Sequence, residues 1–185
     1  TLRDKTVRGR LESLPYEIVA GWKAYPTRVS FGNLGVHMKS PAVVNIASVP
    51  HRSLFRYPGG KTWLVPITRA WLQSLPQPPH LVEPFAGGAI VSLSALFDGM
   101  ASSITLVELD DDVSAVWRII RSGRARLLAE RILDFKVSSN SVRRVLEQPA
   151  PTVLDRAFAA IVRNRMQRGG IMARGAGLLK SGENG

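Results

Sequence analysis

The chain has 185 residues, of which 45% are hydrophobic and 21% are charged, values typical of a globular protein with a real core. It contains no cysteine, which excludes disulfide bonds and thiolate metal sites and is compatible with a reducing cytoplasm. We therefore expect a cytoplasmic protein with no bound metal. No run of about 18 or more apolar residues occurs, so we expect no membrane-spanning segment.

The net charge of +11 is distributed unevenly along the chain. Residues 1–61 hold 10 Lys or Arg and 3 Asp or Glu, and residues 118–180 hold 14 and 4. The intervening residues 62–117 hold only 1 basic residue against 6 acidic ones. Two basic flanks around an acidic centre favour a polyanionic partner such as double-stranded DNA, while the alternative is a charged face that contacts only water.

Residues 1–37 contain scattered prolines and glycines and show no sustained period of 2 or 3.6. The chain does not begin with methionine, and Met38 stands shortly before the first glycine motif. We therefore expect residues 1–37 to be an appended or poorly ordered extension. The alternative is a small DNA-binding extension that uses Arg3, Lys5, Arg8 and Arg10.

The first glycine motif is YPGGK, residues 57–61, and a helix is predicted to follow it over residues 61–75. In this helix Trp63, Ile67 and Trp71 recur at helical spacing, so we expect both tryptophans to pack into the core.

A second glycine motif, LVEPFAGGA, covers residues 81–89. It reads as a strand, a tight glycine loop and a helix over residues 89–97, which is the first unit of a doubly wound α/β sheet. The next strand, residues 104–107, ends in Glu108, and an acid at that position can accept hydrogen bonds from ribose hydroxyls. The unit predicts a nucleoside pocket in which glycines let the ligand approach the backbone.

The two motifs in this order resemble the adenine-N6 DNA methyltransferases of the Dam type. That family has an aromatic-X-Gly-Gly-Lys element before a Val-Glu-Pro-Phe-X-Gly loop, and the resemblance extends from about Leu54 to the end of the chain. Departures are small: Gly88 and Ala89 stand where many relatives have Ala-Gly, and Glu108 stands where many have Asp.

The resemblance implies an α/β, Rossmann-like S-adenosylmethionine-dependent methyltransferase fold, with S-adenosylmethionine as the cofactor. Residues 83–88 would surround its methionine end, Lys61 would pair with its carboxylate, Tyr57 would form part of the wall, and Glu108 would hold the ribose. The expected cofactor residues are Tyr57, Lys61, Glu83, Pro84, Phe85, Ala86, Gly87, Gly88 and Glu108.

After Glu108 the pattern becomes helical, beginning with residues 113–120. We interpret Asp111 and Asp112 as charges that stabilise the start of this helix, and Asp110 as a residue that could contact the cofactor. Two short helices follow over residues 127–135 and 142–146. Thr152 is predicted to cap a third helix, which continues to residue 165.

The end of this third helix carries Asn164, Arg165, Arg168 and Gly170. In the Dam-type family an Asn-Arg followed by a Gly opens the region that meets the target DNA, so the resemblance implies DNA contacts for these residues. The alternative is a helix end with favourable cations. The expected division is an extension (1–37), a cofactor-binding part (38–123) and a truncated helical target-recognition segment (124–185).

No Asp-Pro-Pro or Asn-Pro-Pro occurs in the 185 residues, whereas the family carries an Asp-Pro-Pro-Tyr type catalytic motif. We therefore expect the cofactor-binding portion of an adenine-specific DNA methyltransferase, inactive by itself. A different Rossmann-type enzyme with a dinucleotide is one alternative, although the loop lacks the Gly-X-Gly-X-X-Gly spacing. A non-enzymatic basic module for DNA or RNA is the other.

Overall fold

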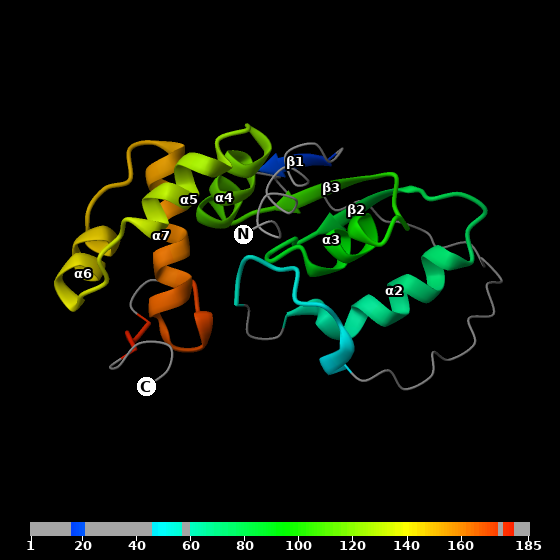
Figure 1. The fold of residues 1–185 in the computed structure, drawn as a ribbon, viewed down its shortest axis with the longest axis horizontal. Helices are drawn as coiled ribbons and strands as arrows, with labels where there is room; N and C mark the ends of the chain where they lie inside the picture. Colours follow the sequence, from blue (N-terminus) through cyan, green and yellow to red (C-terminus); the bar gives the residue numbers. More distant parts are fainter. Residues whose placement is uncertain (1–15, 21–45, 57–59, 174–175, 180–185) are drawn as a thin grey trace, which may run out of the picture.

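The structure is a computed structural model that describes residues 16–20, 46–56, 60–173 and 176–179. Within these ranges the chain is a mixed α/β protein with a small parallel sheet (Figure 1). Its elements are β1 (Tyr16–Ala20), η1 (Ile46–Ser48), η2 (Lys61–Trp63), α2 (Leu64–Gln73), β2 (His80–Pro84), α3 (Ile90–Phe97), β3 (Ser103–Glu108), α4 (Asp111–Arg121), α5 (Ala125–Leu133), α6 (Ser139–Glu147), α7 (Val153–Met166) and η3 (Arg168–Gly170). None of these helices has the length and apolar character needed to cross a membrane.

The sheet has the order β1-β3-β2, and both pairings are parallel. β3 lies in the middle, with Ile104 opposite Tyr16 of β1 on one side and opposite Leu81 of β2 on the other. The predicted succession of strand, glycine loop, helix and second strand is confirmed as β2, α3 and β3. Because β2 and β3 are parallel, their carboxyl ends lie at the same edge of the sheet, where nucleotide sites form in open α/β folds.

α3 packs against β2 and β3, and α2 packs against α3 (Figure 1). Seven of the eight residues of α3 are buried, which fits a helix between the sheet and a second helix. Along β2 the side chains alternate, since Leu81 and Glu83 are buried and Val82 and Pro84 are exposed. The chain therefore supplies helices for one face of β2 and leaves the other side of this strand exposed within the described residues.

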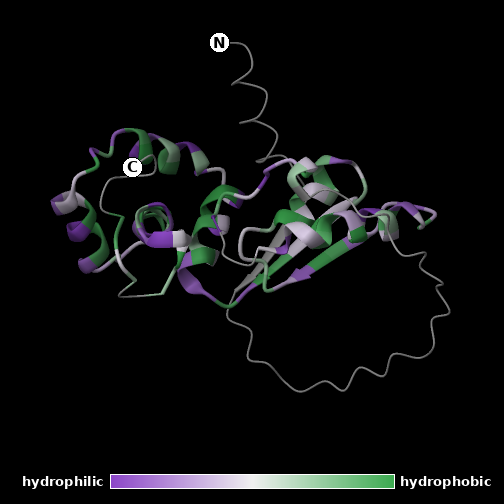
Figure 2. Ribbon diagram, turned by 90° about the horizontal axis from the view of Figure 1, so that it is seen from below, coloured by the Kyte–Doolittle hydropathy of each residue, from purple (hydrophilic) through white to green (hydrophobic). Residues whose placement is uncertain are grey.

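The second half is helical and is built around α7, which contacts α4, α5 and α6. Figure 2 shows α7 end-on among the other helices. α4 lies between the two halves, since it contacts α7 as well as β1 and β3. One apolar cluster runs through both halves and includes Leu106, Trp117 and Phe158. The predicted cap of α7 is confirmed: Thr152 Oγ1 accepts a hydrogen bond of 3.0 Å from the Asp155 N–H.

β1 lies inside the segment 1–37 that the sequence analysis treats as an extension. Its five residues, Tyr-Glu-Ile-Val-Ala, pair along their whole length with β3. The run is rich in residues that favour strands, but it is too short for its alternation to stand out among the neighbouring prolines and glycines. This strand was not expected from the sequence.

The expected burial of the tryptophans near α2 is wrong. Trp63 is 54% exposed and Trp71 is 39% exposed, whereas Val65 and Leu72 are buried. Val65 and Leu72 are seven positions apart, which is two helical turns, so the buried face lies away from the tryptophans. The size and hydrophobicity of the two tryptophans thus predicted the wrong buried face for this helix.

Candidate functional site

The loop between β2 and α3 has an unusual backbone. Phe85, Gly87 and Ala89 all have positive φ, at 53°, 51° and 52°. For Phe85 and Ala89 this conformation costs roughly 1–2 kcal/mol each, because a Cβ is present. The loop is held by hydrogen bonds from the Ala86 N–H to the Val107 carbonyl (2.9 Å) and from the Ala89 N–H to the Ala86 carbonyl (2.7 Å). Strained residues of this kind are concentrated at binding sites.

Glu83 and Lys61 join the two glycine motifs. Glu83 Oε1 lies 2.6 Å from Lys61 Nζ, and Glu83 Oε2 accepts a 2.8 Å hydrogen bond from the Ser92 N–H in the first turn of α3. Lys61 Nζ also donates to the carbonyls of Pro84 (3.3 Å) and Phe85 (2.8 Å). Lys61 therefore holds the strained loop through the carbonyls of Pro84 and Phe85, and with Glu83 it has three acceptors for its three N–H groups.

Glu108 closes the other side of the loop. Its Oε2 accepts a 2.6 Å hydrogen bond from the Gly87 N–H, and its Oε1 accepts one of 2.9 Å from the Asp110 N–H. The Gly87 carbonyl in turn accepts a 2.9 Å hydrogen bond from Trp117 Nε1 on α4. Each oxygen of a carboxylate can accept two hydrogen bonds, so Glu108 retains acceptor capacity for a ligand.

The two motifs line one cavity of about 360 Å³. Its walls come from residues 51–56 before the first motif, from Gly60 to Thr62, and from the strained loop. The lining residues are His51, Ser53, Phe55, Arg56, Gly60, Lys61, Thr62, Phe85, Ala86, Gly87, Gly88, Ala89 and Ile90. A Cβ at Gly88 would lie 2.0 Å from Ser53 Oγ, so a larger residue there would displace the Ser53 hydroxyl.

A larger cavity of about 750 Å³ lies among α4, α6, α7 and residues 176–178. None of the predicted cofactor residues lines it. No residue of the strained loop lines it either, so we place the candidate site in the smaller cavity.

The predicted cofactor residues fall into three groups. Lys61, Phe85, Ala86, Gly87 and Gly88 line the cavity, while Glu83, Pro84 and Glu108 contact its lining residues without lining it themselves. Tyr57 lies outside the described residues.

Two exposed apolar side chains flank the strand ends. Phe85, which the motif had indicated, is 79% exposed, and Leu109, directly after Glu108, is 66% exposed. Leu109 was missed by the sequence analysis. Its signal was the position of a large apolar residue immediately after an acid that ends a strand, at the edge of the sheet where ligands bind in open α/β folds.

The three aspartates after Leu109 serve the helices. Asp110 Oδ1 accepts hydrogen bonds from the N–H groups of Asp112 (2.8 Å) and Val113 (3.2 Å), so Asp110 is the N-cap of α4. The expectation that Asp110 contacts a cofactor stays a prediction, beside this capping role. Asp111 and Asp112 lie in the first turn as expected, and Asp112 also pairs with Arg163 of α7.

The residues predicted to contact DNA differ greatly in exposure. Arg168 is exposed on the turn after α7, whereas Asn164 and Gly170 are buried. Asn164 uses its side-chain amide in hydrogen bonds to the backbone of Arg56 and Gly170. Arg165 donates through Nη2 to the Leu54 carbonyl at 3.2 Å. Among the four, only Arg168 is exposed in the structure.

Within the described ranges, no three His, Asp or Glu side chains are grouped so that they could hold a metal ion. No protein-family model matches the chain, and no curated protein matches it in sequence. The assignment of the site therefore depends on its geometry.

Proposed function

We propose that this chain forms the S-adenosylmethionine-binding portion of an adenine-N6 DNA methyltransferase with a Rossmann-like methyltransferase fold. The observation that carries the proposal is the meeting of both glycine motifs around one cavity. Lys61 of the first motif is ion-paired with Glu83 of the second, and residues of both line the same space. Two unrelated turns would have no reason to meet in this way at the carboxyl ends of parallel strands.

The cavity fits such a cofactor in size and chemistry. Its volume of about 360 Å³ lies within the range of about 300–1,000 Å³ that is usual for small-molecule sites. Arg56 lines it and supplies positive charge for a carboxylate, and the glycine at position 88 allows close approach to the backbone. A bound S-adenosylmethionine would supply an electrophilic methyl group on its sulfonium.

Each residue has a distinct role in the proposal. Glu108 accepts hydrogen bonds from the ribose hydroxyls with the acceptor capacity that Gly87 and Asp110 leave. Leu109 provides an apolar surface for the adenine ring. The loop from Phe85 to Gly88 surrounds the methionine end. A carboxylate at Lys61 would have to compete with Glu83 and two carbonyls, so the lysine acts first by holding the loop in its strained form.

The basic segment 118–180 is the proposed DNA side of the protein. Its 14 Lys or Arg against 4 Asp or Glu favour contacts with phosphates. Arg168 is exposed just after α7, and Asn164 near the end of the same helix is hydrogen-bonded to Arg56 in the cavity wall. The proposal assigns no catalytic residue, because the 185 residues contain no Asp-Pro-Pro or Asn-Pro-Pro.

Isothermal titration calorimetry with S-adenosylmethionine tests the cofactor site. We expect Glu108→Ala and Lys61→Ala each to weaken binding by about 1–3 kcal/mol, because each change removes charge-assisted hydrogen bonds that form or support the site. Glu147→Ala is the matched control, since this glutamate is exposed on α6, and it should bind like the parent chain. Absence of binding by the parent chain, or unchanged affinity in both site variants, would overturn the proposal.

A further inference from the structure

Asn164 is a buried polar residue that acts on two segments at once. It lies in the last turn of α7 and is 1% exposed. Its Oδ1 accepts a 2.9 Å hydrogen bond from the Arg56 N–H, and its Nδ2 donates to the Arg56 carbonyl at 2.7 Å and to the Gly170 carbonyl at 2.9 Å. One side-chain amide therefore pairs with both backbone groups of Arg56 and with the turn after α7.

The two segments also touch directly. Gly170 has φ +69°, and a Cβ built there would lie 2.5 Å from the Arg56 carbonyl oxygen. Only glycine suits both the backbone conformation and this separation. Arg165 adds a hydrogen bond to the Leu54 carbonyl at 3.2 Å. Residues 54–56 are thus attached at several points to the end of α7 and to η3.

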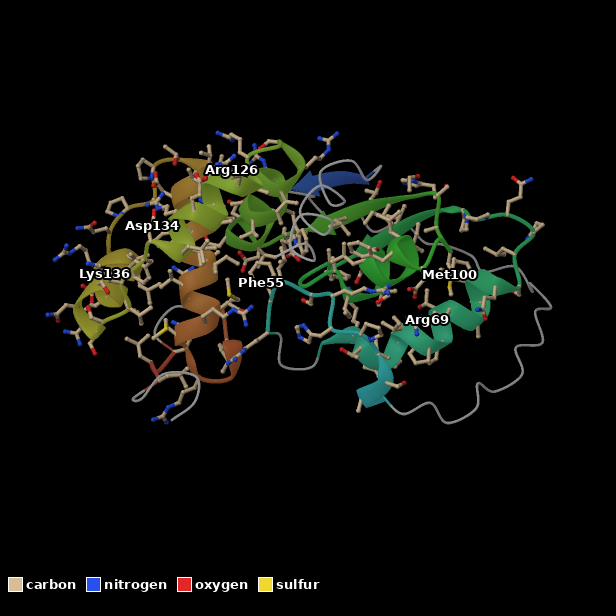
Figure 3. The ribbon with its side chains drawn as sticks, viewed as in Figure 1. Phe55, Arg69, Met100, Arg126, Asp134 and Lys136 are labelled. Atoms are coloured by element: carbon tan, nitrogen blue, oxygen red, sulfur yellow. The ribbon has the colours of Figure 1, made fainter. Side chains whose placement is uncertain are left out.

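The same segment forms a wall of the candidate cofactor cavity. Ser53, Phe55 and Arg56 line it. Phe55 is buried with its ring 6.2 Å from the ring of Trp117, the residue that also bonds to the Gly87 carbonyl. Figure 3 shows Phe55 between the helical half and the sheet. A displacement of this wall would move the Arg56 backbone, and with it Asn164 and Gly170, which contact that backbone directly.

We infer that Asn164 is a positioning residue that couples occupancy of the cavity to the conformation of the Arg168–Gly170 turn, so that S-adenosylmethionine and DNA bind cooperatively. This inference rests on the proposed function. It differs from the expectation that Asn164 contacts DNA, because a residue with 1% exposure acts through its backbone partners. Coupling between sites is reciprocal, so each ligand raises the affinity for the other by the same factor.

Two substitutions remove the coupling in different ways. Asn164→Asp retains the size of the side chain and the acceptor for the Arg56 N–H, but it places a carboxylate against the carbonyls of Arg56 and Gly170. Gly170→Ala leaves the amide intact and forces the turn away from Arg56. Asn140→Ala is the control, because this asparagine is exposed on α6.

The experiment measures the affinity of the full chain for S-adenosylmethionine by calorimetry, with and without a saturating short unmethylated DNA duplex. Circular dichroism checks that each variant is folded. We expect the duplex to tighten cofactor binding at least about fivefold in the parent chain and in Asn140→Ala. In Asn164→Asp and Gly170→Ala the ratio should fall toward one, while the cofactor still binds without DNA.

The outcomes separate the inference from the proposed function. If the parent chain binds the cofactor but the duplex leaves its affinity unchanged, the coupling is wrong and the cofactor site stands. The coupling is also wrong if the duplex tightens cofactor binding by the same factor in the parent chain and in a folded Asn164→Asp or Gly170→Ala variant. If the parent chain does not bind the cofactor at all, the proposed function and the coupling both fall.

Discussion

At the scale of single residues, Asp98 is the carboxylate with the most charged partners in the described sheet half. Arg52 Nη2 lies 2.7 Å from its Oδ1, and Arg69 Nη2 lies 2.6 Å from its Oδ2. Burial raises the pKa of Asp98, but hydrogen bonds and positive charge from Arg52 and Arg69 outweigh it, so the pKa lies below the usual 3.8. Asp98 follows α3 and Arg69 lies on α2, so this pair attaches the two helices.

A lowered pKa in the folded state makes stability depend on pH. The contribution of Asp98 is complete above about pH 3.8 and is lost as the pH falls through its lower, folded-state pKa. We expect Asp98→Asn to reduce the free energy of unfolding at about pH 7 by about 1–2 kcal/mol, and the difference from the parent chain to shrink at about pH 3. Urea denaturation at both pH values measures this.

Asp134→Asn is the control for this prediction. Asp134 is exposed after α5, away from Arg69, and Figure 3 labels both residues. Its replacement should leave the urea midpoint within the error of the parent chain. If Asp98→Asn lowers the free energy of unfolding as much at about pH 3 as at about pH 7, the charge of Asp98 is not the cause of the destabilisation.

Which site residues were predictable depended on how local their geometry is. Glu83 and Glu108 end strands, and strand ends can be recognised from a short apolar run followed by an acid. Asn164 could not be placed in this way, because its role needs Arg56, which is 108 positions away in the sequence. The same is true of Lys61, whose partners Glu83, Pro84 and Phe85 come from the second motif.

At the scale of elements, α4 connects the helical half to the glycine loop through Trp117. This residue is 1% exposed, packs against Phe55 and donates from Nε1 to the Gly87 carbonyl at 2.9 Å. Removal of the indole N–H would leave the buried Gly87 carbonyl without this hydrogen bond, and an unsatisfied buried acceptor costs about 1–3 kcal/mol.

We therefore expect Trp117→Phe to lower the free energy of unfolding by about 2–4 kcal/mol, from the lost hydrogen bond and from the space that the smaller ring leaves. Trp71→Phe is the matched control, because Trp71 is 39% exposed on α2, and it should cost less than about 0.5 kcal/mol. Chemical denaturation, monitored by circular dichroism, measures the free energy of unfolding of both variants. Equal losses in the two variants would contradict the role given to the indole N–H.

The elements were predicted better than their faces. Apolar periodicity and turn residues identified β2, α3, β3, α4 and α7, because these signals are local. The buried face of α2 was wrong because a periodicity of bulky residues also fits an exposed stripe, and only the partner helix α3 decides which side is covered. β1 was missed because its pairing partner β3 is distant in the sequence.

At the scale of the whole molecule, the charge is the main guide to a partner. The basic excess lies in the helical half and near the amino terminus of the chain, whereas residues 62–117, which form the sheet unit and the start of α4, are acidic overall. Basic side chains in such numbers bind nucleic acid through phosphates and release counterions.

We expect the chain to bind DNA weakly, without sequence preference and with a steep dependence on salt. Fluorescence anisotropy with a labelled duplex should show affinity falling strongly between about 50 and 200 mM salt. Arg168→Ala should reduce the slope of log affinity against log salt by about one, because it removes a phosphate contact. Arg126, which is 83% exposed and paired with Glu130, is the control position for alanine substitution. An affinity that does not change over this salt range would exclude phosphate-dominated binding.

The order of strands in the sheet also determines how the chain folds. Paired residues of β2 and β3 are 23 positions apart (His80 and Ser103), whereas those of β1 and β3 are 88 apart (Tyr16 and Ile104). Closing the longer loop costs about 1 kcal/mol more in chain entropy. We therefore expect the β2–α3–β3 unit to form early and β1 to join the sheet late in folding. Destabilising changes in β1 should consequently accelerate unfolding and have little effect on the folding rate, which stopped-flow measurements of both rates would test.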